Sequence, residues 1–142
     1  MKMNSVSIPD RVLAGLRRQA VAAAPAECCG ALIGAAHGRM IEVRSLIPVE
    51  NDAPSHTHYH IDADTVLRLE RQAVCSAQQV VGFYHSHPNN TAVPSVTDIE
   101  LACPGYLYLI VQTDTGAVRG WRLRDDRAGF NELDITALEG AA

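Results

Sequence analysis

The chain has 142 residues, a formal net charge of −4, and hydrophobic residues at 47% of its positions. This length suits one domain spanning residues 1–142, with a core of its own, and is too short for two. A weakly acidic chain lacks the positive surface by which proteins bind DNA or RNA. We therefore expect no nucleic-acid partner.

The first residues, from Met1 to Ser5, lack the apolar core of a secretion signal. No stretch approaches the ~20 apolar residues that a membrane-spanning helix needs. We therefore expect no membrane partner and a cytoplasmic location. The cysteines have no C-x-x-C spacing, and in a reducing compartment they are expected to be small buried side chains. They are Cys28, Cys29, Cys75 and Cys103.

The first half of the chain predicts two helices with two strands between them. In chain order we expect a helix from Pro9 to the residue before Pro25, strands at 28–35 and 40–49, a short extended segment at 56–61, and a helix at 63–77. The first helix has an apolar face made by Val12, Leu13, Leu16, Ala20 and Ala23. The second is expected to turn Val66, Leu67 and Val74 toward the core.

The second half predicts mostly strands. They are expected at 79–85, at 106–112 and 118–124 as a hairpin, and at 130–137, with a short helix at 95–102 that Pro104-Gly105 ends. Helices alternating with strands indicate a single α/β (α+β) domain, with a central, mostly antiparallel or mixed sheet and helices packed on it.

Two histidines, His85 and His87, end an apolar strand, and alternate strand residues point to the same face. Asp98 can supply a third ligand, because a loop bounded by prolines returns the chain and Ser95 opens the next helix. Ser95 and Asp98 also have the spacing of an ordinary capping box. Two imidazoles and a carboxylate leave one tetrahedral position open on zinc, which is typical of hydrolytic sites. We expect one Zn²⁺ per chain.

The joint pattern H-x-H-x₇-S-x₂-D resembles the signature of the JAMM (MPN+) zinc metallopeptidases. It matches at His85, His87, Ser95 and Asp98 without a gap. The resemblance implies a JAMM/cytidine-deaminase-like fold, with a curved mixed sheet flanked by helices and the metal at the edge of the sheet.

The same family pattern includes a glutamate before a strand of small residues, and Glu27 precedes such a strand. The resemblance implies that Glu27 is the general base that takes a proton from water and then returns one to the leaving amine. It further implies that Ser95 helps to stabilise the tetrahedral oxyanion.

Members of this family hydrolyse peptide or isopeptide bonds after the Gly-Gly tail of ubiquitin or ubiquitin-like proteins. The short stretch between Glu27 and His85 is similar to that of compact bacterial members, which trim small sulfur-carrier proteins and release cysteine or a C-terminal extension. Two alternatives within the family stay open. The chain could be a deubiquitinase-like isopeptidase acting on conjugated ubiquitin-like proteins, or a non-catalytic MPN-type binding scaffold.

Other kinds of site fit the residues less well. A zinc-dependent nucleoside deaminase needs H-x-E and P-C-x-x-C, and the chain has neither. A nucleophilic Cys29 would leave the paired histidines, Ser95 and Asp98 without a role. The histidines at positions 56, 58 and 60 alternate along an extended segment, which suits either a second metal site or a wall of the substrate path. The oligomeric state is not predicted.

Overall fold

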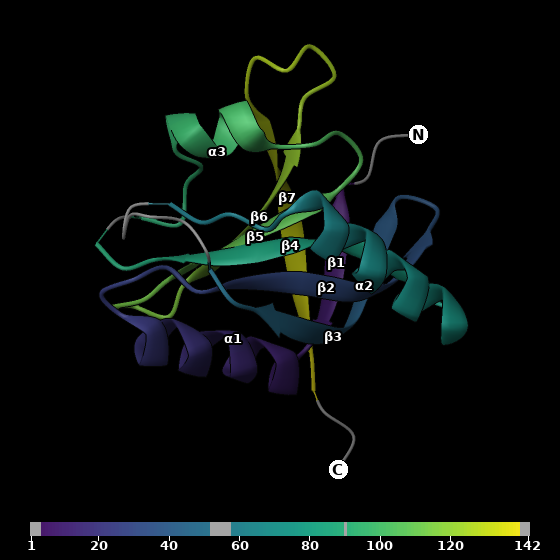
Figure 1. Ribbon diagram of the computed structural model, residues 1–142, viewed down its shortest axis with the longest axis horizontal. Coiled ribbons are helices and arrows are strands. Elements are labelled where there is room, and N and C mark those ends of the chain that lie inside the picture. The colour runs from purple at the N-terminus through teal and green to yellow at the C-terminus, as the bar shows by residue number, and fades with distance from the viewer. Residues whose placement is uncertain (1–3, 52–57, 90, 140–142) are drawn as a thin grey trace.

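The computed structural model describes residues 4–51, 58–89 and 91–139. Its helices and strands follow one another along the chain as shown in Figure 1. They are β1 (Ser5–Pro9), α1 (Asp10–Ala23), β2 (Cys29–His37), β3 (Met40–Val49), α2 (Ala63–Cys75), β4 (Gln79–His87), α3 (Val96–Leu101), β5 (Leu107–Gln112), β6 (Val118–Leu123) and β7 (Phe130–Leu138).

The strands form a mixed sheet that closes into a barrel in the order β1-β3-β2-β4-β5-β6-β7. Neighbouring strands are antiparallel except that β4 runs parallel to β5, and β1 runs parallel to both β3 and β7. The mixed α+β character agrees with the sequence prediction. The sheet is more strongly curved than predicted, because β1 pairs with both edge strands, β3 and β7, and closes the sheet into a barrel.

β1 is a strand that the sequence analysis missed. Its three central residues, Val6 to Ile8, are all buried, although Ser7 is polar. Residues Ser5 to Ile8 do alternate polar and apolar side chains, but the run is only four residues long and ends at Pro9. Its pairing partners, β3 and β7, are distant in the chain, so the short local pattern does not show that it completes a sheet.

Two apolar clusters cover the two faces of the sheet. The first is built on Val12, Leu13 and Leu16 of α1, and the second on Leu69 and Ala73 of α2. Figure 1 shows α1 and α2 on opposite sides of the strands. Successive residues of β4 alternate between these clusters, since Phe83 belongs to the α2 cluster and Tyr84 to the α1 cluster.

The predicted inward face of α2 is wrong in part. Val66 packs against the core as expected, but Leu67 and Val74 are 46% and 70% exposed. The buried positions of the helix are Leu69 and Ala73. The core-facing stripe therefore runs through positions 66, 69 and 73, at the helical spacing of three and four residues, and includes a small alanine in place of the larger Val74.

β4 continues two residues beyond its predicted end and includes both His85 and His87. It lies very close to β5, because a Cβ atom on Gly82 would stand 1.9 Å from the Leu107 carbonyl oxygen. Only glycine allows this approach. The pairing with β5 then holds His85 opposite Ile110 and His87 opposite Gln112.

The cysteines are free, and the expectation that they are buried is wrong for two of them. Cys29 is buried and Cys28 is half-buried, whereas Cys75 and Cys103 are exposed. Cys75 is the last residue of α2, and Cys103 lies just after α3, so both occupy surface ends of helices. In the described ranges, no helix has both the length and the apolar character needed to cross a membrane.

Candidate metal centre

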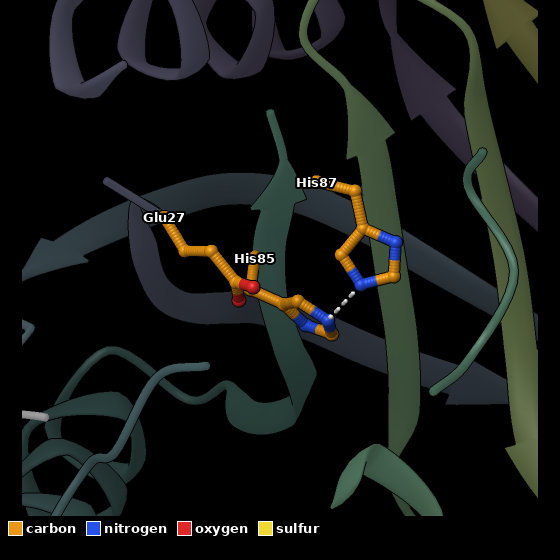
Figure 2. A group of neighbouring side chains, drawn as sticks. All are labelled: Glu27, His85 and His87. Carbon is orange, nitrogen blue, oxygen red and sulfur yellow. Dashed lines mark hydrogen bonds between the residues drawn. The ribbon is translucent and has the colours of Figure 1, made fainter. Parts of the chain in front are cut away.

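The two histidines of β4 project from the same face of the strand, and both are buried, with 1% and 5% of their surface exposed. β2 runs antiparallel to β4 and pairs Cys29 with His85. This register brings Glu27, two residues earlier in the chain, to the same end of the sheet. Figure 2 shows the Glu27 side chain coming from a separate segment and pointing toward the His85 side chain.

Three donor atoms form a nearly equilateral triangle. The Nε2 atoms of His85 and His87 are 3.2 Å apart, and the Asp98 Oδ2 atom is 3.2 Å from each of them. Tetrahedral zinc with bonds of about 2.0–2.1 Å needs ligand atoms about 3.3 Å apart. The spacing of these three atoms therefore fits a single zinc ion.

The His87 ring is oriented by its second nitrogen. Its Nδ1 atom donates to the Thr91 carbonyl oxygen at 2.7 Å, so the proton lies on Nδ1 and the Nε2 lone pair faces the other donors. Burial acts to lower the pKa of His87, but the contacts of its protonated ring with Asp98 and Thr91 outweigh it, and the pKa lies above its usual value.

The His85 ring is covered by Tyr59, which stacks on it with ring centroids 4.3 Å apart and an angle of 22° between the planes. Burial lowers the pKa of His85 below its usual value, although Asp98 opposes this. A neutral imidazole is the form that binds a metal ion. Tyr59 therefore both shields this histidine from water and fixes the plane of its ring.

Asp98 is placed by the cap of α3. Ser95 Oγ accepts from the Asp98 N–H at 3.0 Å, and the Ser95 N–H donates to Asp98 Oδ2 at 2.9 Å. The predicted capping box is thus present. Burial acts to raise the pKa of Asp98, but the close contacts with the His85 and His87 imidazoles outweigh it and hold the pKa well below its usual range. The carboxylate is therefore ionised, as a metal ligand must be.

Glu27 is a second buried carboxylate at this site, with 5% of its surface exposed. Its ligand atom lies within 4.8 Å of those of His85 and His87. Burial raises the pKa of Glu27 to about 7, with the nearby His87 lowering it and Asp98 raising it. Its Oε1 atom is buried with no hydrogen-bond partner among the described residues. This buried oxygen without a partner lies beside the three possible metal-ligand atoms, so it is suited to contact a bound cation or a water molecule.

Two polar side chains that the sequence analysis did not single out hold the Glu27 segment. Ser86 Oγ accepts from the Cys28 N–H at 2.8 Å. The Asn51 amide donates to the carbonyl oxygens of Glu27, at 3.0 Å, and His58, at 3.2 Å. Ser86 could have been noticed from its place between the histidines. Asn51 carries no local signal, because its contacts join segments that are distant in the chain.

The sequence suggested two alternative sites, one at the histidines of positions 56, 58 and 60 and one at a nucleophilic Cys29. His56 lies outside the described residues. In the part of the chain that the structure describes, the three side chains grouped as able to hold a metal ion are Glu27, His85 and His87. Asp98 is not in this group, although its Oδ2 atom lies 3.2 Å from both histidine Nε2 atoms. Neither His58 nor His60 belongs to it. Residues 58–61 are neither helix nor strand, and from this segment Tyr59 is the residue that contacts the site. Cys29 is 1% exposed, and its thiol donates to the Val49 carbonyl, which does not suit a nucleophile.

The fold and site define a mixed α+β domain with a candidate metal site at one end of the β2–β4 pair. The chain belongs to the family described as prokaryotic homologs of the JAB domain, whose model matches residues 9–124. This confirms the resemblance found in the sequence.

Similar proteins include two with assigned activities. The chain is 37% identical over 128 residues to the desampylase of Haloferax volcanii, covering 89% of this chain and 88% of that protein. It is 36% identical over 90 residues to the CysO-cysteine peptidase of Mycobacterium tuberculosis, covering 63% of this chain and 60% of that protein.

Two structures solved in solution are also similar. One is a protein of Desulfitobacterium hafniense, with a TM-score of 0.84 and 26% identity, covering 95% of this chain and 94% of the other. The second is a protein of Salinibacter ruber, with a TM-score of 0.70 and 31% identity, covering 97% and 92%. The architecture described above is therefore shared with experimentally determined members of the same fold.

Proposed function

We propose that this chain is a zinc-dependent peptidase or isopeptidase that hydrolyses the amide bond after a Gly-Gly-type tail of a small ubiquitin-like or sulfur-carrier protein. The observation that carries the proposal is the triangle of donor atoms from His85, His87 and Asp98, with the buried Glu27 carboxylate beside it. A non-catalytic scaffold has no need for three donor atoms at zinc spacing next to a buried acid.

In this proposal the zinc ion is bound by His85, His87 and Asp98. Glu27 acts as the general base and then as the general acid. Zinc, when bound, supplies a positive charge that acidifies water and polarises the scissile carbonyl. Asp98 is assigned as the ligand because its Oδ2 atom is within 3.2 Å of both imidazole nitrogens. Glu27 takes a proton from the attacking water on its carboxylate and delivers one to the leaving amine.

Ser95 is proposed to stabilise the oxyanion. Its Oγ atom accepts from the Asp98 N–H, which leaves the hydroxyl proton available to donate. The hydroxyl stands at the start of the helix that carries Asp98, on the exposed side of the site. Its capping and oxyanion roles use opposite ends of the same O–H group, so one serine can perform both.

The substrate class rests on the two named relatives and on the size of the chain. A desampylase and a CysO-cysteine peptidase are both similar to it, and it matches 88% of the former. We propose that residues 1–142 form one peptidase domain, with no large insertion to grip a ubiquitin chain. Selectivity would then lie in the extended C-terminal tail of the substrate, where glycines let the backbone pass close to Glu27.

Mass spectrometry tests this proposal most directly. The zinc-loaded protein is incubated with candidate carriers that bear cysteine, a short extension or an isopeptide-linked partner after Gly-Gly. The mass of each carrier is measured before and after incubation. We expect the mass to fall to that of the free Gly-Gly form, and to stay unchanged with Glu27→Gln. A zinc-loaded protein that binds such carriers and leaves every one intact would favour the scaffold alternative.

A further inference from the structure

The segment that carries Ser95 and Asp98 leaves the sheet after β4 and returns at β5. None of the residues of α3 is buried, and Val96 and Leu101 are 73% and 59% exposed. Figure 1 shows α3 standing apart from the strands. Apolar packing of its own helix therefore does not hold this segment in place.

The buried residues of the described part of this segment, 88–89 and 91–103, are two alanines, one on each side of α3. Ala92 is 1% exposed and Ala102 is 3% exposed. The carbonyl oxygen of each accepts a side-chain hydrogen bond from the β6–β7 hairpin. The Trp121 indole N–H donates to Ala92 at 2.9 Å, and the Arg127 guanidinium donates to Ala102 at 3.3 Å. The segment is thus attached to the barrel at both ends.

The attachment at Ala92 is one peptide away from the metal centre. The carbonyl before it, that of Thr91, accepts the His87 Nδ1–H at 2.7 Å. Because consecutive peptide planes share a Cα atom, fixing the Ala92 carbonyl also restricts the Thr91 carbonyl. The Thr91 carbonyl selects the tautomer of His87 that presents Nε2 to Asp98 and His85.

Trp121 is itself held firmly. Its side chain is 8% exposed and belongs to the core cluster on the α2 face. The Arg119 guanidinium lies 4.8 Å from the centre of its ring, and the same guanidinium forms two hydrogen bonds to Glu132, at 2.8 and 2.7 Å. A rigid indole is a better support for a loop than a side chain that samples several rotamers.

We propose that Trp121 is a positioning residue for this centre: its indole N–H holds the Ala92 carbonyl, and through the adjoining Thr91 carbonyl it orients the His87 ring for metal binding. The inference rests on the proposed function for the identity of the ligand, but the support itself is a property of the protein without metal. Partners of this kind, one step removed from the ligands, typically change metal affinity by about 10–100-fold when lost.

The test compares Trp121→Phe with Tyr106→Phe. The first change keeps an aromatic ring and removes the indole N–H. The second is a matched control, because the Tyr106 hydroxyl also donates one hydrogen bond, but to the Glu70 side chain of α2 and not to a carbonyl of segment 88–103. We expect Trp121→Phe to raise the zinc dissociation constant about tenfold, measured by competition with a chromophoric chelator, and Tyr106→Phe to leave it unchanged. Equal affinities for Trp121→Phe and the wild type, or an equal loss in both variants, would overturn the inference.

Hydrogen exchange in the metal-free protein separates this inference from the proposed function. The chain has one tryptophan, so its indole N–H gives a single NMR signal. We expect this proton to exchange slowly in the wild type, and the His87 Nδ1 proton to exchange faster in Trp121→Phe. Rapid indole exchange in the wild type would overturn the inference even if the variant did not fold. A wild type that binds no zinc would refute the proposed function, while the exchange rates would still decide the role of Trp121.

Discussion

Ser86 and Cys28 are joined by two hydrogen bonds. Ser86 Oγ accepts from the Cys28 N–H at 2.8 Å, and the Ser86 N–H donates to the Cys28 carbonyl at 3.1 Å. Ser86 is fully buried and stands between the two histidines of β4. The strand that provides two candidate ligands therefore also fixes the residue next to the candidate base, so the three groups keep their relative positions.

Replacing Ser86 by alanine tests this relationship. The change leaves the Cys28 N–H without its partner, which costs about 1–3 kcal/mol when the group is buried, and lets the Glu27 segment shift. We expect the variant to retain zinc and to lose about tenfold in kcat, as is common for groups that orient a site. Zinc content and steady-state kinetics measure the two effects. Full activity in a variant that is measurably less stable would limit Ser86 to a structural role.

The ligand assignment predicts about one zinc ion per chain in the purified protein. His87→Ala should lose it, because two remaining ligands do not hold zinc tightly. His37→Ala is the matched control, since that histidine is 52% exposed and pairs with Glu42 at the far end of β2. Elemental analysis measures the zinc content per chain of the wild type, His87→Ala and His37→Ala. A metal-free preparation with full activity would contradict the assignment.

Two carboxylates lie near the histidines, and amide substitutions distinguish their roles. Glu27→Gln removes the proton acceptor and keeps the side-chain size, so zinc should remain while kcat falls by about 10²–10⁴-fold. Asp98→Asn removes the charge nearest both imidazoles, so zinc should be lost together with activity. If Glu27→Gln also released zinc, Glu27 would have to be counted among the ligands.

The pKa of Glu27 predicts how the metal-free protein responds to pH. Burial raises this pKa from 4.5 to about 7, so the folded state binds the proton more tightly than the unfolded state. The free energy of unfolding should therefore fall as pH rises from 4.5 to about 7, and stay lower above that range. In protein freed of metal with a chelator, Glu27→Gln should raise the free energy of unfolding by about 1–3 kcal/mol near pH 8, and by less near pH 5. Urea unfolding at both values measures this, and an equal gain at both would contradict the pKa assignment.

The substrate prediction concerns the tail. A small carrier with a residue or short extension after Gly-Gly should be cleaved, and changing the last glycine to valine should abolish cleavage almost completely. A side chain at this point would keep the backbone away from Glu27. Ubiquitin chains should be cleaved slowly at best. Equal or faster turnover of polyubiquitin, measured with the same preparation, would show that the compact chain does not restrict the substrate in this way.

The sequence by itself determined the parts of the candidate site that depend on local geometry. The alternation of a strand puts His85 and His87 on one face, and the first turn of a helix brings Ser95 and Asp98 into a capping box. Both arrangements span a few residues, so their spacing is visible in the chain. The order of most helices and strands was predictable for the same reason, because the periods of two and 3.6 are local.

Only the tertiary structure decided which distant segments meet. The closure of the barrel by β1, the stacking of Tyr59 on His85 and the bond from Trp121 to Ala92 join residues far apart in the chain. The face of α2 was also set this way, since a small alanine at position 73 faces the core while the larger Val74 is exposed. Such contacts depend on the register between strands and on the packing of whole elements. No period within the sequence encodes them.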